Sequence, residues 1–237
     1  MSEKILNLLF LFVVGTIGGI FADQILWPYF IEKPLFSEYR LEQTPIYVTE
    51  RKEVTVTEDI ALQDAVAKVE SIVVGIRTVT VDNVIVGSGL IVTSDGLFVT
   101  LNDLVPRDSE LSFFIDGKSV SFQILKRDAV HNLALVKVEK NNLPTVSFAD
   151  LEKIKLGQRI FLIGVVFDGK GVRRVVNEGL IRSFDEEAIE TNVFESVVLA
   201  GSPLFDIKGS CLGLSQINPQ GRVIAIPIDQ VKSFIGL

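Results

Sequence analysis

The residue types that carry nucleophilic or metal chemistry are scarce in this chain. It has one histidine, His131, and one cysteine, Cys211. A Ser-His-Asp or Cys-His mechanism would therefore have to use His131, and one residue of each type is too little for an ordinary zinc site. We expect no metal and no cofactor. Cys211 lies in the apolar run GSCLGL, which favours a small buried side chain over a nucleophile.

Three segments combine glycines or small residues with polar residues at the ends of β-rich runs, and a fourth closes the chain. In chain order they read VGSGLIVT at 86–93 with VTLNDLV at 99–105, RDAVHNLALVKV at 127–138, IETNVFESVVLAGSPL at 189–204, and RVIAIPI at 222–228. No single piece is decisive. Their order and spacing together form a specific pattern.

This pattern resembles the protease domain of trypsin-like serine proteases of the HtrA/Deg type. In that family the first segment ends V-T-N-N-H-V-V, the second contains D-L-A-L-L-K-V, and the third contains G-N-S-G-G-P-L. The resemblance runs from about Asp59 to the C-terminus. We expect no PDZ domain in this chain, although the family carries them.

The resemblance places unsuitable residues at all three triad positions. Asp103 stands where the family has the catalytic His, Asn132 where it has the Asp, and Ala200 where it has the nucleophilic Ser. A methyl group cannot attack a carbonyl, a carboxylate is a weak base at neutral pH, and an amide cannot stabilise an imidazolium. In a related enzyme, loss of Ser or His alone costs on the order of 10⁶ in rate. We therefore expect no peptidase activity.

The oxyanion hole implied by the resemblance is also altered. Its two N–H donors would come from Val198 and Ala200, and Val198 replaces a glycine whose backbone freedom a β-branched residue lacks. Ser202 is displaced from the nucleophile position and is expected only to replace a glycine. His131 adjoins Asn132 on a strand, so its side chain should point away from the site. Leu199, Gly201 and Ser202 are the candidates for lining a peptide cleft.

The elements that would position these residues are short strands. From Ser71 onward, β-rich runs alternate with turns such as Asp116-Gly117, and only Asp229–Phe234 again has a helical period. The expected fold class is all-β, a trypsin-like double six-stranded β-barrel over 57–237, split near 145–157. One short helix, predicted over Thr57–Glu70, precedes it.

The N-terminal segment Ile5–Ala22 is almost wholly apolar. As a helix it would span roughly 27 Å, close to the hydrocarbon thickness of about 30 Å. We expect an uncleaved transmembrane anchor over 5–22, with 1–4 in the cytoplasm and a juxtamembrane linker over 23–56. A cleaved signal peptide is the alternative, although no A-x-A site follows the run.

Charge and resemblance together define the functional hypotheses. The net charge is −7 and no basic run is present, so nucleic acid is not an expected partner. The leading hypothesis is a single-pass, membrane-anchored pseudoprotease outside the cytoplasm, periplasmic or extracellular. It would bind peptides or proteins, or regulate an active relative within a homo- or heterotrimer. The alternatives are an active HtrA-like serine endopeptidase in envelope protein quality control and a purely structural envelope domain.

Overall fold

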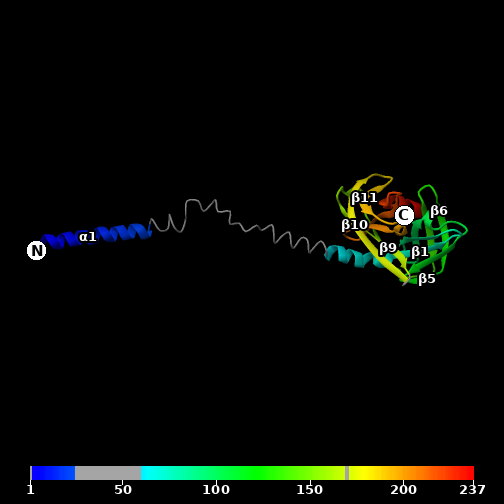
Figure 1. Ribbon diagram of the computed structural model, residues 1–237, viewed down its shortest axis with the longest axis horizontal. Coiled ribbons are helices and arrows are strands. Elements are labelled where there is room, and N and C mark those ends of the chain that lie inside the picture. The colour runs from blue at the N-terminus through cyan, green and yellow to red at the C-terminus, as the bar shows by residue number, and fades with distance from the viewer. Residues whose placement is uncertain (1, 25–59, 169–170) are drawn as a thin grey trace. The chain divides into compact units, whose positions relative to one another are not determined.

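The computed structural model describes residues 2–24, 60–168 and 171–237 (Figure 1). The chain separates into two units, Met1–Thr55 and Val56–Leu237, each considered by itself. Most of the predicted linker over 23–56, and the predicted helix start at Thr57, lie outside the described residues. The predicted boundaries of anchor and linker therefore stay predictions.

The first unit contains α1, Ser2–Phe21. Its apolar side chains from Leu8 to Phe12 are exposed, as are most that follow. Among the described residues it contains the one stretch long and apolar enough to cross a membrane, Asn7–Gln24, with a mean hydropathy of 1.5. A signal sequence near an N-terminus has the same features.

The second unit opens with helical residues 60–69, continued by the short η3, Glu70–Ile72. The helical residues agree with the helix predicted up to Glu70. Ala65 and Val69 are buried on one face, and the Lys68 ammonium donates to the carbonyl of Lys208, 3.1 Å away. The helix is thus held against the loop at Lys208 by packing and by one hydrogen bond.

The first sheet has seven strands in the order β5-β4-β1-β2-β3-β7-β6. Their bounds are β1 Val73–Val79, β2 Val84–Ile91, β3 Leu97–Leu101, β4 Glu110–Ile115, β5 Lys118–Val120, β6 Phe122–Asp128 and β7 Leu133–Val138. The predicted turn joins β4 to β5 with Asp116 at φ 52° and Gly117 at φ 73°. Two successive positive φ angles characterise the type I′ hairpin turn.

The second sheet also has seven strands, in the order β12-β9-β10-β11-β14-β13-β8, and β12 pairs again with β13. This extra pairing closes six strands into a barrel. Their bounds are β8 Ser147–Phe148, β9 Arg159–Asp168, β10 Gly171–Phe184, β11 Ile189–Phe194, β12 Pro203–Asp206, β13 Ser210–Ile217 and β14 Arg222–Pro227.

The all-β trypsin-like class is confirmed, with one correction to the expected pair of closed barrels. The first sheet is a half-barrel, and β5 and β6 remain its two edges. Only Ser121 separates these strands, whereas the tightest common hairpin loop has two residues. They therefore cannot pair with each other, and the half-barrel stays open at this corner.

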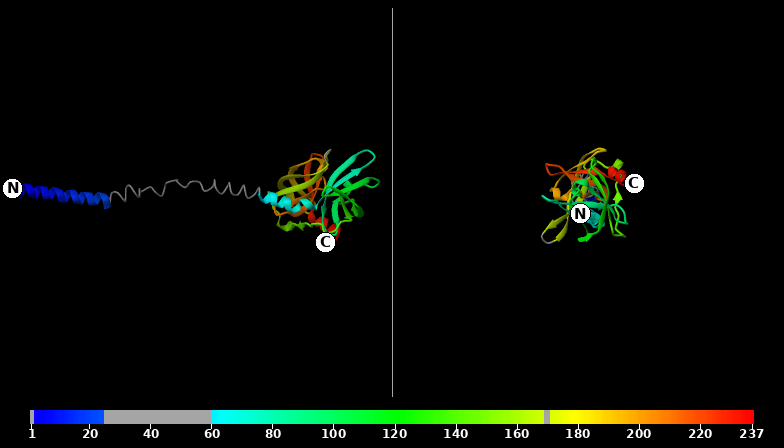
Figure 2. Two further views of the ribbon diagram at one scale, coloured as in Figure 1. Left: turned by 90° about the horizontal axis from the view of Figure 1, so that it is seen from below. Right: turned by 90° about the vertical axis from the view of Figure 1, so that its right-hand side faces the viewer.

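One apolar core joins the two sheets. Phe161 and Phe205 of the second sheet belong to the same buried cluster as Phe98 and Phe113 of the first. A buried hydrogen bond adds to this contact, because the Val165 amide donates to Ser88 Oγ over 2.8 Å. The second barrel has a further cluster of its own. Figure 2 shows the green first sheet beside the yellow-to-red second one. The two sheets are consequently held together by one shared core.

The chain closes with α3, Ile228–Ile235, which buries Ile228, Val231 and Phe234. Gly236 ends it at φ 85°, and its amide donates to the carbonyl of Lys232 over 2.9 Å. A left-handed glycine of this kind is a common helix stop. The helix agrees with the helical period predicted at Asp229–Phe234.

Cys211 should be chemically inert in the folded protein. Its thiol is fully buried, and burial raises its pKa to about 12 because the thiolate would lose its hydration. We expect no reaction with Ellman's reagent at pH 8 under native conditions, and one equivalent of reaction in 6 M guanidinium. Rapid labelling of the native protein would contradict the observed packing.

Candidate functional site

The residue at the first predicted triad position is presented by a single turn of 3-10 helix. Strand β3 ends at Leu101 and is followed by η4, Asn102–Leu104. Leu104 is buried, and its carbonyl accepts a hydrogen bond from Thr78 Oγ1 over 2.6 Å. These contacts of Leu104 fix the turn. Asp103, within the same turn, is exposed to solvent.

Asp103 and Asn132 are brought together although 29 positions separate them. The Asp103 amide donates to Asn132 Oδ1 over 3.0 Å, and Asn132 Nδ2 donates to Asp103 Oδ2 over 3.0 Å. Asn132 has φ 55°, a left-handed conformation that Asn tolerates. The two hydrogen bonds form a closed ring that uses both ends of the Asn132 amide.

His131 lies outside this pair. Its Nδ1 is 2.7 Å from Asp128 Oδ2, and the His131 side chain is 54% exposed. The hydrogen bond from His131 lowers the pKa of the Asp128 carboxyl. The imidazole of the only histidine in the chain therefore partners Asp128. The prediction that His131 and Asn132 lie on a strand is wrong, because both lie in the turn between β6 and β7.

The loop carrying Ala200 begins with the short η6, Val197–Leu199. The amide of Ala200 donates to the carbonyl of Val197 over 3.0 Å, and the Ala200 carbonyl accepts from the Ser88 amide over 2.9 Å. An oxyanion hole needs free N–H groups aimed at one point. One of its two expected donors, the Ala200 amide, is thus already occupied in this loop conformation.

The same part of the first sheet contacts both segments. A Cβ placed on Gly87 would lie 2.4 Å from Leu104 Cδ1 and 2.8 Å from the carbonyl oxygen of Ala200. Leu104 follows Asp103 directly in the chain. The three predicted triad positions therefore belong to neighbouring loops: Asp103 and Asn132 touch through side chains, and the loop of Ala200 packs beside them at Gly87.

The expected peptide-cleft residues are less accessible than the sequence suggests. Leu199, Gly201 and Ser202 are all buried. Gly201 has φ 74°, and a Cβ there would lie 2.3 Å from the carbonyl oxygen of Ser88. A bound peptide would not reach these side chains in the present conformation. The correction arises because the loop folds inward onto the first sheet, which residue types in a loop do not reveal.

Ser202 is unusual because its hydroxyl is fully buried and has no hydrogen-bond partner within the described residues. A Cβ on Gly164 would lie 2.4 Å from Ser202 Oγ, which shows how closely strand β9 approaches it. Its surroundings offer no base. Ser202 is therefore not placed as a substitute nucleophile.

We expect Ser202→Ala to stabilise the fold by about 1 kcal/mol, because it removes a buried hydroxyl whose desolvation is uncompensated. Ser215→Ala is the matched control. Ser215 Oγ donates to the Ser202 carbonyl over 2.8 Å, so its loss should destabilise the fold by about 1 kcal/mol. Urea unfolding of both variants measures the two signs, and a loss of stability in Ser202→Ala would show that its hydroxyl has a partner.

The part of the chain that the structure describes holds no group of three His, Cys, Asp or Glu side chains placed to bind a metal ion. The acids of the site are single carboxylates with protein partners.

Comparison with known proteins agrees with the fold. The model of the trypsin-like peptidase domain matches residues 87–214, more than half of the chain. The chain belongs to the trypsin-like peptidase domain family. The matched residues run from Gly87, which packs on the Ala200 carbonyl, to Leu214 in β13.

Individual relatives are of the HtrA and DegP kind. The "Probable periplasmic serine endoprotease DegP-like" of Halomonas elongata is 32% identical over 155 residues, covering 60% of this chain and 33% of the relative. Its counterpart in Pseudomonas putida is 34% identical over 158 residues, or 60% and 32%. "Serine protease HTRA1" of Xenopus laevis is 27% identical over 164 residues, or 63% and 35%. The chain thus spans about a third of the length of the curated relatives it matches.

Proposed function

We propose that this chain is a pseudoprotease, a trypsin-like domain that binds a peptide or protein segment without cleaving it. The observation that carries the proposal is the hydrogen-bonded ring of Asp103 and Asn132. At the position of a general base it leaves a carboxylate, which is a weak proton acceptor at neutral pH. Ala200 offers no nucleophilic atom to serve it.

The loop conformation supports the same proposal. Because the Ala200 amide is donated to Val197, the loop does not present the pair of N–H groups that would stabilise a tetrahedral oxyanion. Removing one such donor costs about 10²–10³ in rate in a related enzyme. The missing side chains and the occupied donor both impair formation of the tetrahedral intermediate, and each alone would slow acyl transfer severely.

A peptide could still bind by adding a strand beside β13. The amide and carbonyl of Ser215 point away from β14, toward Ser202 and Gly201. Along an antiparallel strand, the N–H and C=O of successive residues point alternately toward and away from the paired strand. Ile217 is two residues after Ser215 and lies opposite Val223 of β14. The N–H and C=O of Ile217 therefore point away from β14 like those of Ser215. They are the pair to which an extended peptide would bond.

Exposed apolar side chains lie on other elements of the same barrel. Val197 is 66% exposed and Phe194 is 57% exposed. Phe194 faces Arg222 across the pairing of β11 with β14, and the guanidinium lies 5.5 Å from the ring centroid. Exposed apolar residues on the barrel that bears the open strand edge favour a ligand with apolar side chains. This argues for peptide binding over a purely structural role.

The test uses the full chain in detergent with a fluorophosphonate probe and a casein digestion assay, beside an active DegP-type protease as positive control. We expect neither labelling nor cleavage above the blank. Labelling or cleavage would refute the pseudoprotease and favour an active endopeptidase, the activity that the relatives' names state.

The cell-envelope location is part of the proposal. The apolar helix α1 and relatives named periplasmic support an anchored domain outside the cytoplasm. We propose 5–22 as the anchor, 23–56 as a linker and 57–237 as the binding domain, alone or in a homo- or heterotrimer. N-terminal sequencing of the mature protein distinguishes the anchor from a cleaved signal, since cleavage near Ala22 would remove Met1.

A further inference from the structure

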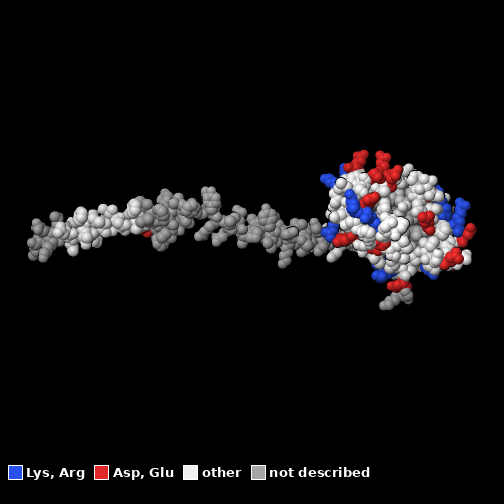
Figure 3. All heavy atoms as spheres, turned by 45° about the horizontal axis from the view of Figure 1, so that its top comes forward, with Lys and Arg blue, Asp and Glu red and all other residues white. Residues whose placement is uncertain are grey.

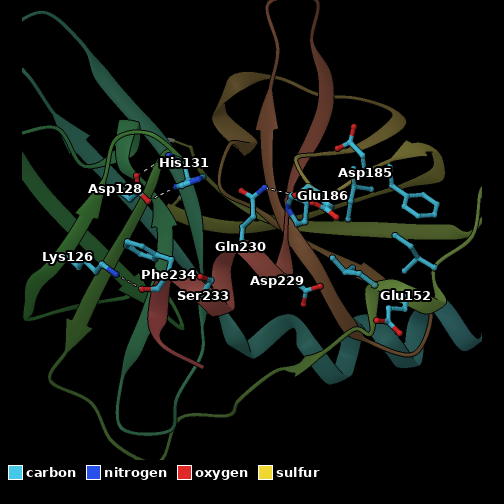
Figure 4. Close-up of a pocket in the computed structure, with 15 residues that line it drawn as sticks. Lys126, Asp128, His131, Glu152, Asp185, Glu186, Asp229, Gln230, Ser233 and Phe234 are labelled. Carbon is cyan, nitrogen blue, oxygen red and sulfur yellow. Dashed lines mark hydrogen bonds and ion pairs between the residues drawn. The ribbon is translucent and has the colours of Figure 1, made fainter.

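A cavity outside the predicted triad positions has a volume of about 800 Å³ (Figure 4). It is enclosed by the end of β6 and the loop after it, the short η5 (Leu151–Lys153), the β10–β11 turn and α3. The pocket therefore uses both sheets and the C-terminal helix. None of Asp103, Asn132 and Ala200 lines it.

Part of its lining is apolar. Leu151, Ile154, Phe184 and Phe234 all contribute. Phe184 is 39% exposed although it is a large aromatic residue at the end of a strand. An apolar concave surface of this volume suits one or two large apolar side chains of a ligand.

Its charged lining is strongly acidic. The cavity is lined by five carboxylates against one lysine and one histidine, namely Asp128, Glu152, Asp185, Glu186, Asp229, Lys126 and His131. The ammonium of Lys126 donates to the carbonyl of Phe234 over 2.8 Å and lies 4.6 Å from the Phe234 ring centroid. This lysine is therefore bound to the end of α3 and not to a carboxylate.

Two of the carboxylates have no polar partner among the described residues, those of Glu152 and Glu186. Some surface acids elsewhere in the domain have cationic partners. Asp116 pairs with Arg174 at 3.0 Å, and Glu178 pairs with Arg159 at 2.9 Å. On the face drawn in Figure 3, acidic and basic side chains are interspersed. The pocket is thus a site where negative charge is left uncompensated.

The acidic turn is held in place before any ligand arrives. Gln230 Nε2 donates to the carbonyl of Glu186 over 2.7 Å and to that of Glu187 over 3.3 Å. Asp185 Oδ1 accepts from the amides of Glu187 and Ala188, each over 2.8 Å. A preorganised rim lowers the ordering cost of binding.

We propose that this pocket docks a partner segment in which a large apolar residue is flanked by lysine or arginine. The apolar side chain would enter between Phe184 and Ile154, and the cationic side chains would bind Glu152 and Glu186. Both halves are needed, because charge attracts the segment and apolar burial retains it. The proposal does not depend on whether the triad positions are catalytically silent.

The test is fluorescence anisotropy with the labelled peptide Lys-Lys-Leu-Phe-Lys-Lys and the full chain in zwitterionic nanodiscs, with empty discs as the blank. At 0.15 M salt we expect the variant Glu152→Gln/Glu186→Gln to weaken binding about 10-fold, as removal of two charged contacts should. Phe184→Ser should weaken it by a similar factor through lost apolar contact.

The matched control is Asp82→Asn/Glu110→Gln, which removes the same charge from residues that do not line the pocket. It should change the affinity less than twofold. Equal weakening in this control, or equal binding of a Lys-Lys-Ser-Ser-Lys-Lys peptide, would show non-specific attraction and overturn the proposal, as would no binding. This assay measures only the affinity of the peptide for the acidic pocket, and neither hydrolysis nor strand addition at β13. A negative result would therefore leave the pseudoprotease proposal standing.

Discussion

Restoring the three triad residue types should not by itself restore efficient hydrolysis. The variant Asp103→His/Asn132→Asp/Ala200→Ser recreates nucleophile, base and orienting carboxylate, but the amide at position 200 is still donated to Val197. Adding Val198→Gly should free the loop to turn its amides outward, because glycine adopts conformations closed to a β-branched residue. We expect the kcat of the quadruple variant to exceed that of the triple variant by a factor of about 10²–10³.

Casein digestion and fluorophosphonate labelling of the two variants measure this difference, with thermal unfolding to confirm that both are folded. The control is the variant Asp103→His/Asn132→Asp/Val198→Gly, which keeps Ala200 and should label no faster than the wild type. Equal activity of the triple and quadruple variants would show that the observed loop conformation imposes no barrier to hydrolysis. The site would then have been lost through its side chains alone.

Asn132→Asp alone should destabilise the fold at neutral pH. It replaces the amide donor to Asp103 Oδ2 by a second carboxylate at the same 3.0 Å contact. Because the site is largely exposed, we expect a loss of about 1–2 kcal/mol in the free energy of unfolding at pH 7. Urea unfolding followed by circular dichroism measures it.

The pH dependence has a definite sign. Two facing carboxylates raise the pKa of the pair in the folded state, so that state binds a proton more readily than the unfolded chain. The deficit relative to the wild type should therefore be small near pH 3, where a shared proton restores the hydrogen bond. It should grow as the pH rises through the raised pKa.

The exchange variant Asp103→Asn/Asn132→Asp is the matched control. It keeps one side-chain amide and one carboxylate. The backbone N–H of residue 103 can still donate to the side chain at position 132. Aspartate also tolerates the positive φ at this position, as Asp108 and Asp116 do elsewhere in the chain. We expect wild-type stability. An exchange variant as unstable as Asn132→Asp would show that side-chain complementarity is not what holds the pair.

The sequence by itself determined the elements and their family, because those depend on local patterns. Alternating apolar residues and D-G turns indicated strands, and the order of four segments indicated a trypsin-like domain. It also led to the prediction that Asp103, Asn132 and Ala200 stand at the triad positions. The structure brings the first two together at the ends of the paired strands β3 and β7.

Only the tertiary structure decided how these positions are used. The ring between Asp103 and Asn132, the occupied Ala200 amide and the burial of Leu199, Gly201 and Ser202 rest on contacts with distant strands. The open edge at Ile217 could have been suspected from alternation along β13, but only the register with β14 fixes its direction. The acidic pocket unites α3 with turns from both sheets, each of which reads as an ordinary polar loop. Hydrogen-bond directions and concave surfaces arise from packing between segments remote in the chain, and residue spacing within any one segment does not encode them.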